Sequence, residues 1–172
     1  MRKINRVSAT LAAATAALAL LVTACSDDSD VSTPTANTPA TSDSASVASV
    51  DGKAIDGKFD TTCAKQGGTL ALALADLDNG TYGNLGISAT LTGDDTVTAV
   101  AIGGTKGGSN GLPYAIGYSP GVPGGSATVT KDGNTYKVTG EGVGTPDPTN
   151  LSGDVPSAKF EITFACSTIV GG

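Results

Sequence analysis

The chain has 172 residues with 24 Gly, 3 Cys, no His and no Trp, and its 16 acidic residues outnumber the 10 basic ones, for a formal net charge of −6. Without His the chain lacks the usual general base and the most common transition-metal ligand, which disfavours an enzyme, a metal site and a cofactor. The acidic balance disfavours a nucleic-acid partner, since phosphate binding needs a basic face. The length suits a single domain.

Residues 1–24 are predicted to be a lipoprotein signal peptide that is removed. Three basic residues precede an apolar run from Val7 to Val22, which is short for a membrane-spanning helix but suits a signal peptide. Two small residues then lead to Cys25, which completes a bacterial lipobox. We therefore expect acyl groups such as palmitate on Cys25, and a protein lipid-anchored at the extracytoplasmic face of the cell membrane. The alternative is an ordinary secretory signal followed by an incidental Cys.

Removal of this leader would discard three basic residues and no acidic ones. The mature chain would then keep 7 basic and 16 acidic residues, a formal net charge of −9. An anionic bilayer surface would repel such a chain, so the lipid must supply the attraction to the membrane. Two or three acyl chains suffice for this, whereas one chain holds only marginally.

Residues 25–49 are predicted to be the lipidated Cys followed by a disordered spacer. From Ser26 to Ser49 the chain has no aromatic residue and no Leu, Ile, Lys or Arg. It therefore cannot bury enough apolar surface to offset its ordering entropy. Threonines near two prolines are candidate O-glycosylation sites, although an unmodified linker fits the sequence equally well. These candidates are Thr33, Thr35, Thr38 and Thr41.

Residues 50–172 contain all the glycines and consist of short runs separated by turn signals. This pattern predicts one all-β domain, a mostly antiparallel β-sandwich or half-barrel. The first expected strand covers Lys58–Cys63. In Thr69–Leu77, Leu alternates with Ala, which predicts a central strand with both faces covered, although the leucines would also suit a short helix. Ile87–Leu91 alternates in the same way and predicts a further strand.

The clearest strand signal lies near the C-terminus, at Lys159–Cys166. Its Phe, Ile, Phe and Cys side chains occupy alternate positions, so they share one buried face. Upstream, Lys131–Asn134 predicts a tight hairpin, because Asp-Gly tolerates the positive φ that such a turn needs. The strand after this turn would bury Tyr136 and Val138.

Two cysteines remain after Cys25 is assigned to lipid. Cys63 and Cys166 are both in phase with the buried faces of their expected strands. Export removes the chain from the reducing cytosol, so we predict a disulfide between them that ties the first long strand to the last. The alternative is a pair of free buried thiols.

Two other segments suggest sites only weakly. The glycine-rich run Gly103–Gly108 lacks the Gly-Lys-Ser/Thr order of a phosphate-binding loop, so we expect a flexible connection between strands. Asp76, Asp78 and Asn79 offer oxygen ligands for Ca²⁺, but their spacing is not that of a helix–loop–helix site, and we expect a turn.

A candidate ligand face follows, on a segment flanked by Gly and Pro clusters. If this segment is a strand, its four alternating large residues share one face, and mobile loops around it could open a groove for a lipid or another apolar ligand. The alternative, which the sequence favours, is that they are plain core. The four residues are Leu112, Tyr114, Ile116 and Tyr118.

Several segments together resemble the mycobacterial 19-kilodalton lipoprotein antigen family, of LpqH type. The most specific are the run from Lys131 to Gly140 and the closing Phe-Glu-Ile to Cys-Ser run. The chain departs from the family near residues 103–111 and in the tail after Ser167. The matching segments in chain order are Val22–Cys25, the Ser/Thr/Ala/Pro spacer, Val50–Lys53, Cys63, Gly117–Tyr118, Ser126–Thr128, Lys131–Gly140, Lys159–Ile162 and Cys166–Ser167.

The resemblance implies a surface-exposed, acylated and often glycosylated cell-envelope lipoprotein that can be shed or carried in vesicles. It implies an antigen whose lipidated N-terminus is sensed by host Toll-like receptor 2, and roles in adhesion or in carrying an apolar ligand. By position, Cys25 would carry the acyl groups, Cys63 and Cys166 the disulfide, and the spacer threonines the glycans. No enzymatic activity is implied.

Overall fold

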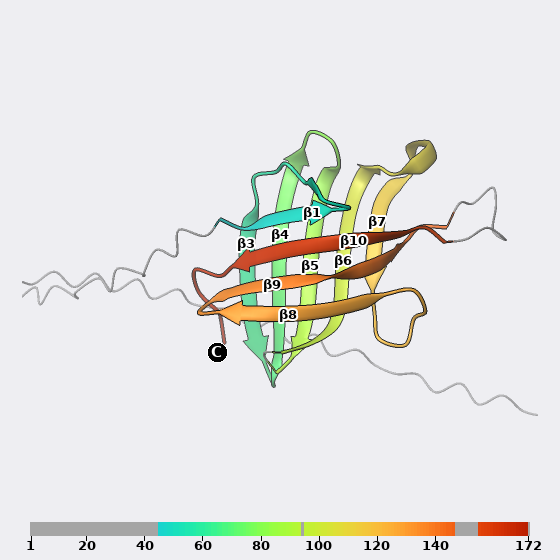
Figure 1. Cartoon of the computed structure of the whole chain (residues 1–172). Helices are drawn as coiled ribbons and strands as arrows, with labels where there is room; N and C mark the ends of the chain where they lie inside the picture. The colour runs from blue at the N-terminus through green and yellow to red at the C-terminus, as the bar shows by residue number, and fades with distance from the viewer. Residues whose placement is uncertain (1–44, 94, 147–154, 172) are drawn as a thin grey trace, which may run out of the picture. The chain divides into compact units, whose positions relative to one another are not determined.

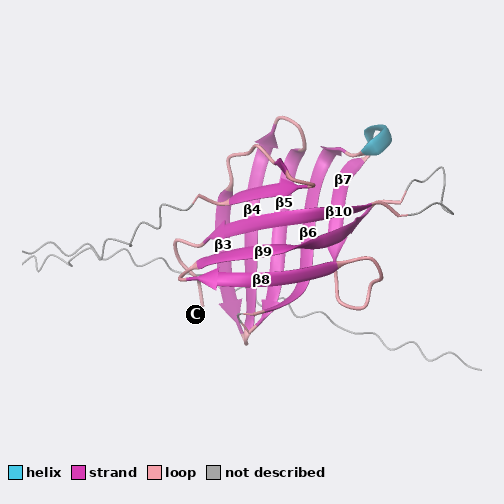
Figure 2. Cartoon of the chain, viewed as in Figure 1, coloured by secondary structure: helices cyan, strands magenta, loops and turns pink. Residues whose placement is uncertain are grey.

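The computed structural model describes residues 45–93, 95–146 and 155–171. Apart from its loops, this part of the chain consists of β-strands and one 3₁₀ turn (Figure 2), which confirms the all-β class. In chain order the elements are β1 (Val47–Val50), β2 (Lys53–Ala54), β3 (Asp60–Gln66), β4 (Thr69–Asn79), β5 (Gly83–Thr92), β6 (Thr96–Gly107), η1 (Ser109–Gly111), β7 (Pro113–Tyr118), β8 (Ser126–Asp132), β9 (Thr135–Gly144) and β10 (Ser157–Ala165).

The strands form one antiparallel sheet in the order β2-β1-β10-β9-β7-β6-β5-β4-β3, and β8 also pairs with β9. The sheet curls over itself, so that β1, β10, β9 and β8 run across β3 to β7 (Figure 1). In the described part, β7 and β9 join the two halves through two paired positions, Ile116 with Gly144 and Gly117 with Val143. The result is the half-barrel form expected from the sequence.

Glycines of β9 allow the neighbouring strands to approach closely. A Cβ on Gly142 would lie 2.5 Å from Cγ2 of Ile116, and a Cβ on Gly140 would overlap the carbonyl oxygen of Ser126. Side chains at these two positions would therefore push the neighbouring strands apart.

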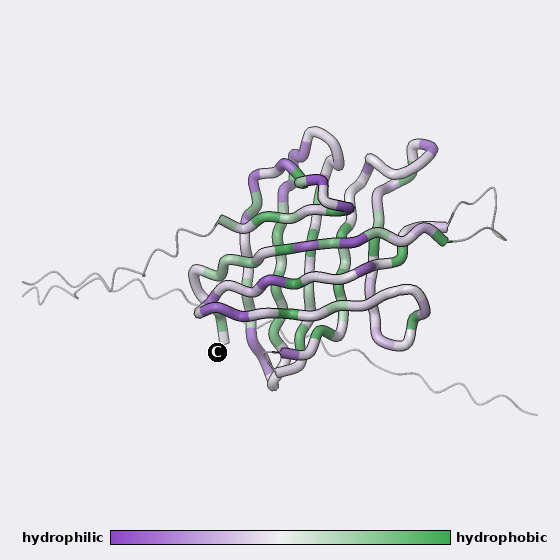
Figure 3. The backbone as a smooth tube through the Cα atoms, viewed as in Figure 1, coloured by the Kyte–Doolittle hydropathy of each residue, from purple (hydrophilic) through white to green (hydrophobic). Residues whose placement is uncertain are grey.

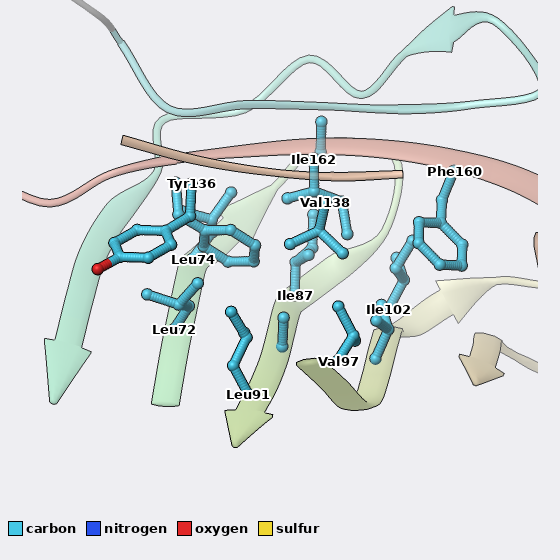
Figure 4. Packing of buried hydrophobic residues seen from close by; sticks show 14 of the residues in the cluster. Leu72, Leu74, Ile87, Leu91, Val97, Ile102, Tyr136, Val138, Phe160 and Ile162 are labelled. Atoms are coloured by element: carbon cyan, nitrogen blue, oxygen red, sulfur yellow. The ribbon is translucent and has the colours of Figure 1, made fainter. Parts of the chain in front are cut away.

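Apolar side chains from the two halves meet between them and form the core (Figure 4). The alternation predicted near the C-terminus is confirmed, because Phe160, Ile162 and Phe164 of β10 are buried, as are Tyr136 and Val138 of β9. Hydrophobic and hydrophilic positions accordingly alternate along β9 and β10 (Figure 3). The opposite wall comes from β4 to β6 and includes Leu70, Leu72, Leu74, Ile87, Leu91, Val97 and Ile102.

The Leu-Ala run, for which the sequence allowed a strand or a short helix, forms strand β4. Leu70, Leu72 and Leu74 point into the core, whereas Leu77 is 74% exposed, which excludes the alternative helix face. The expectation that both faces are covered is wrong. Ala71 is exposed, because β4 lies between β3 and β5 and no further layer of the described residues covers its alanine side.

The structure contains the disulfide between Cys63 and Cys166, whose Cα atoms lie 5.9 Å apart. Just beyond it, the tail after Ser167 turns back onto β3. The Lys65 N–H donates to the Val170 carbonyl oxygen over 2.8 Å, and the Val170 N–H donates to the Cys63 carbonyl oxygen over 3.0 Å. The tail thus covers part of an edge strand that would otherwise present unpaired backbone groups.

The folded unit begins earlier than the boundary expected at residue 50. Strand β1 starts at Val47, inside the range assigned to the spacer, because it finds a partner strand in β10. Just before it, the Ser46 hydroxyl accepts the Ala165 N–H over 2.9 Å and lies 2.7 Å from the Thr61 hydroxyl. The hairpin expected at residues 131–134 is confirmed, with Gly133 at φ 57°.

Candidate functional site

A cavity of about 330 Å³ opens near the junction of β7 and β9, where β10 begins. This volume lies at the lower end of the range typical for small-molecule sites. Its wall comes from the end of β1, the connection between β6 and β7, strand β7, and the segments that flank residues 147–154. Its apolar lining includes Val50, Leu112, Ile116, Pro146, Pro156 and Ala158.

The candidate ligand face divides between this cavity and the neighbouring core. Leu112, Tyr114 and Ile116 line the cavity, and Ile116 is at the same time buried. Tyr118 does not line it, because its ring lies against Gly125 instead, where a Cβ would be 3.0 Å from Cδ2 of the ring. The alternating pattern therefore describes one strand face, and the cavity occupies one end of that face.

Tyr114 is paired with a second aromatic residue that the sequence did not single out. Its ring centroid lies 4.8 Å from that of Tyr82, with the ring planes tilted by 47°. Aromatic pairs at this separation add stabilisation beyond the apolar area that they bury. Tyr82 thus supports the cavity wall from behind Tyr114.

Glycines of β6 provide the space for Tyr82. The run Gly103–Gly108 was expected to be a flexible loop, but Gly103–Gly107 belongs to strand β6, and only Gly108 lies beyond the strand. A Cβ on Gly104 would lie 2.8 Å from Cβ of Tyr82, and a Cβ on Gly107 would lie 2.8 Å from its Cδ1 atom. The glycines are thus required by a close neighbour rather than by mobility.

Asn79 fixes the turn that carries Tyr82. It is a buried polar residue, and its Oδ1 atom accepts the N–H groups of Thr81 over 3.1 Å and Tyr82 over 3.0 Å. Its Nδ2 group donates to the carbonyl oxygen of Asp56 over 2.8 Å and to Oδ2 of Asp76 over 3.0 Å. Because every polar atom of its amide has a partner, burial of this side chain carries no unsatisfied group.

The Asp76 carboxylate belongs to the same network. The hydrogen bond from Asn79 is the largest cause that lowers the pKa of Asp76, aided by the N–H groups of Lys58 and Asp78. The oxygens considered for Ca²⁺ therefore serve the end of β4 and the following turn. In the described residues, no three acidic or cysteine side chains are grouped to hold a metal ion.

Asp51 and Tyr114 line the cavity together with the polar residues Ser109, Asn110, Thr145 and Ser157. Asp51 occupies a hairpin turn at φ 50°, and its Oδ1 atom accepts the Lys159 N–H over 2.8 Å. Burial, followed by the charges of Tyr82 and Asp51, raises the pKa of Tyr114 to about 12. The Tyr114 phenol is therefore protonated at neutral pH, the form that can donate a hydrogen bond.

The sequence left several wall residues unassigned, most notably Asp51, Pro146 and Pro156. Asp51 lies in the Val50–Lys53 segment that carries part of the family resemblance, but nothing in that segment indicates a cavity about 60 positions further along the chain. The remaining predicted sites, Cys25, Thr33, Thr35, Thr38 and Thr41, lie outside the described residues. In the part that is described, no helix has the length and apolar character needed to cross a membrane.

Comparison with known proteins gives this fold a family. Residues 38–166 match the family model described as Mycobacterium 19 kDa lipoprotein antigen. A protein of Mycobacteroides abscessus, described as a lipoprotein, is 30% identical over 148 residues, which cover 85% of this chain and 88% of that relative. Lipoprotein LpqH of Mycobacterium tuberculosis is 31% identical over 118 residues, 69% of this chain and 67% of the relative, and that of Mycobacterium bovis matches equally. The chain belongs to the Mycobacterium 19 kDa lipoprotein antigen family.

Proposed function

We propose that the protein is a non-enzymatic cell-envelope lipoprotein, held on the extracytoplasmic face of the membrane by acyl groups on Cys25. In this proposal residues 1–24 are removed, the segment from Cys25 links the lipid to the fold, and the β domain lies beyond the membrane. The lipobox that ends at Cys25 carries the proposal, and membership of a lipoprotein family supports it.

At the envelope surface the protein would act as an antigen, and its acylated N-terminus as a ligand of host Toll-like receptor 2 or as part of an adhesin. The acyl chains are the expected recognition element, and the threonines at positions 33, 35, 38 and 41 are proposed glycan acceptors. The folded domain would then be what antibodies or host surfaces contact.

The substitution Cys25→Ala tests both parts of this proposal. It removes the acylated thiol, so the protein should leave the membrane fraction and lose activity in a receptor reporter assay. Ser26→Ala is the matched control, since it changes the next residue and keeps the lipobox Cys. A Cys25→Ala protein that stays on the membrane and signals fully would refute the proposal.

A second candidate function is transport of a small apolar ligand. The observation that favours it is the cavity of about 330 Å³ whose apolar wall includes Leu112, Tyr114 and Ile116. Lipoprotein anchoring would hold such a carrier near its source of ligand.

Mass spectrometry of the protein isolated from cell envelopes tests the carrier function. A non-covalent apolar molecule should copurify with the wild-type chain. Ala158→Phe, in the cavity wall, should displace it, whereas Ala71→Phe, on the exposed face of β4, should not. Equal ligand content in all three proteins would count against the cavity, and its absence from all three would count against a carrier.

A further inference from the structure

We infer that the cavity selects a small apolar ligand with an uncharged, hydrogen-bond-accepting head group, such as an ester or an alcohol, and rejects the anionic counterpart. This inference rests on the proposed carrier function and adds the ligand class to it. It depends on where the apolar, donor and charged groups lie in the cavity wall.

The apolar part of the wall sets the body of the ligand. Val50, Leu112, Ile116 and Pro156 offer hydrocarbon surface without a polar partner to satisfy. With a volume of about 330 Å³, the site is small for a ligand pocket. One short chain or one ring fits such a space better than the paired chains of a phospholipid.

The charges at the rim argue against an anion. Among the described wall residues there is no Lys or Arg, and Asp51 contributes a carboxylate. The adjoining surface adds Glu141 and Lys159, so that two acidic groups face one basic group around the opening. A carboxylate or phosphate in the cavity would lose solvation and meet the like charge of Asp51, while Lys159 lines only the adjoining surface.

The backbone of Lys159 fixes the position of Asp51. Its N–H and carbonyl oxygen are both bonded to Asp51, over 2.8 Å each, which holds the Asp51 carboxylate in place at the rim. The like charge is thus a fixed feature of the wall. A mobile carboxylate could swing away from an anionic ligand, but this one is tied to β10.

Tyr114 supplies the donor that a neutral head group needs. Its phenol lines the cavity and stays protonated through neutral pH. A phenol O–H can donate a hydrogen bond to an ester or alcohol oxygen of a ligand. A quaternary ammonium group is attracted by Asp51 but offers no acceptor for the phenol, so only the neutral ester uses both the apolar wall and the Tyr114 donor.

Binding of three ten-carbon probes would test this selection. The probes are monodecanoylglycerol, decanoate and decyltrimethylammonium, titrated calorimetrically below their micelle concentrations into the chain from Ser26 onward, which lacks both the apolar leader and the lipid. The neutral ester should bind at least about tenfold more tightly than decanoate, as expected for like charge at a partly desolvated rim. It should also bind more tightly than the ammonium probe.

Two substitutions separate the contributions of the rim. Asp51→Asn keeps an acceptor for the Lys159 N–H and suits the positive φ, so it should raise decanoate affinity and leave the ester unchanged. Asp60→Asn, on exposed β3 surface, is the control. Tyr114→Phe should weaken the ester about threefold to tenfold, as expected for one net hydrogen bond.

The outcomes test the inferred ligand class and the proposed carrier function separately. Decanoate or the ammonium probe binding as tightly as the ester, or Asp51→Asn leaving decanoate affinity unchanged, would overturn the inference while a carrier function survives. Failure of all three probes to bind would overturn the carrier function and the inference with it. Circular dichroism spectra of each variant would confirm that the fold is kept.

Discussion

The two ends of the half-barrel are built differently. Where β10 ends, Cys166 is bonded to Cys63, the tail pairs with β3, and Ser46 bridges to Thr61 and Ala165. Where β10 begins, the two halves are joined by a short pairing of β7 with β9, and a cavity lies beside it. One end is closed by covalent and backbone bonds, and the other is hollow.

This difference suggests a division between stability and function. A cavity costs stability, because its wall atoms lack packing partners. The disulfide at the closed end restricts the unfolded chain, and this gain in stability can offset the cost of the cavity. Substitutions at the closed end should therefore act on global stability, whereas those at the open end should act on local packing and on ligand binding.

Loss of the disulfide should have the largest effect on stability. Its two cysteines are 103 positions apart, and a loop of that order corresponds to about 4.7 kcal/mol in the chain-entropy model. We expect the double substitution Cys63→Ala and Cys166→Ala to lower the free energy of unfolding by about 2 to 5 kcal/mol in guanidinium titrations. The reference is the same chain with both cysteines intact, and a loss below about 1 kcal/mol would show that the closed end does not depend on this bond.

Asn79 is expected to be the most sensitive residue near the open end. Asn79→Ala would leave the N–H groups of Thr81 and Tyr82 without their acceptor, at a cost of about 2 to 3 kcal/mol in denaturant titrations. The near-ultraviolet signal of the tyrosine pair should weaken, because the turn that carries Tyr82 loosens. Asn84→Ala, at an exposed position of β5, should change neither quantity. An Asn79→Ala protein with both quantities unchanged would show that the network does not hold Tyr82.

Sequence patterns captured the closed end better than the open end. The alternation around Phe160, Ile162 and Cys166 is a local property of one strand, and a buried strand face follows directly from it. The phase of Cys63 on another strand then made the disulfide a natural expectation. Two features escaped: Ser46, which lies in the segment predicted to be spacer, and the tail, because a single residue, Val170, pairs with β3 and leaves no repeating pattern.

The open end depends on contacts between segments far apart in the chain, which no local pattern contains. The alternating face of strand β7 was visible in the sequence. Other wall residues, such as Val50, Pro146 and Pro156, lie far from β7 in the chain. The glycine-rich run of β6 illustrates the same point. Composition alone predicts a loop there, whereas the neighbouring Tyr82 ring makes small residues necessary in a strand.

A pair of adjacent glycine positions tests that explanation of β6. Gly104 leaves no space for a Cβ beside Tyr82, so Gly104→Ala should lower the free energy of unfolding by about 1 to 3 kcal/mol through overpacking. Gly86, on the neighbouring strand β5, has nothing within 4 Å of its Cβ position. Gly86→Ala should therefore be neutral or slightly stabilising. Equal effects of the two substitutions in thermal or denaturant unfolding would argue that mobility, not Tyr82, selects glycine here.

The smallest effect expected is a loss of stability in alkali that originates at the open end. Burial raises the pKa of Tyr114 from 10.0 to about 12, so above pH 10 the unfolded chain releases this proton before the folded chain does. The contribution of Tyr114 to stability is therefore complete below pH 10 and is lost as the pH rises toward 12. Denaturant titrations between pH 9 and about pH 11 should show this decline. Tyr114→Phe removes the ionisable group and should flatten the decline, and identical slopes for the two proteins would mean that Tyr114 does not couple the open end to pH.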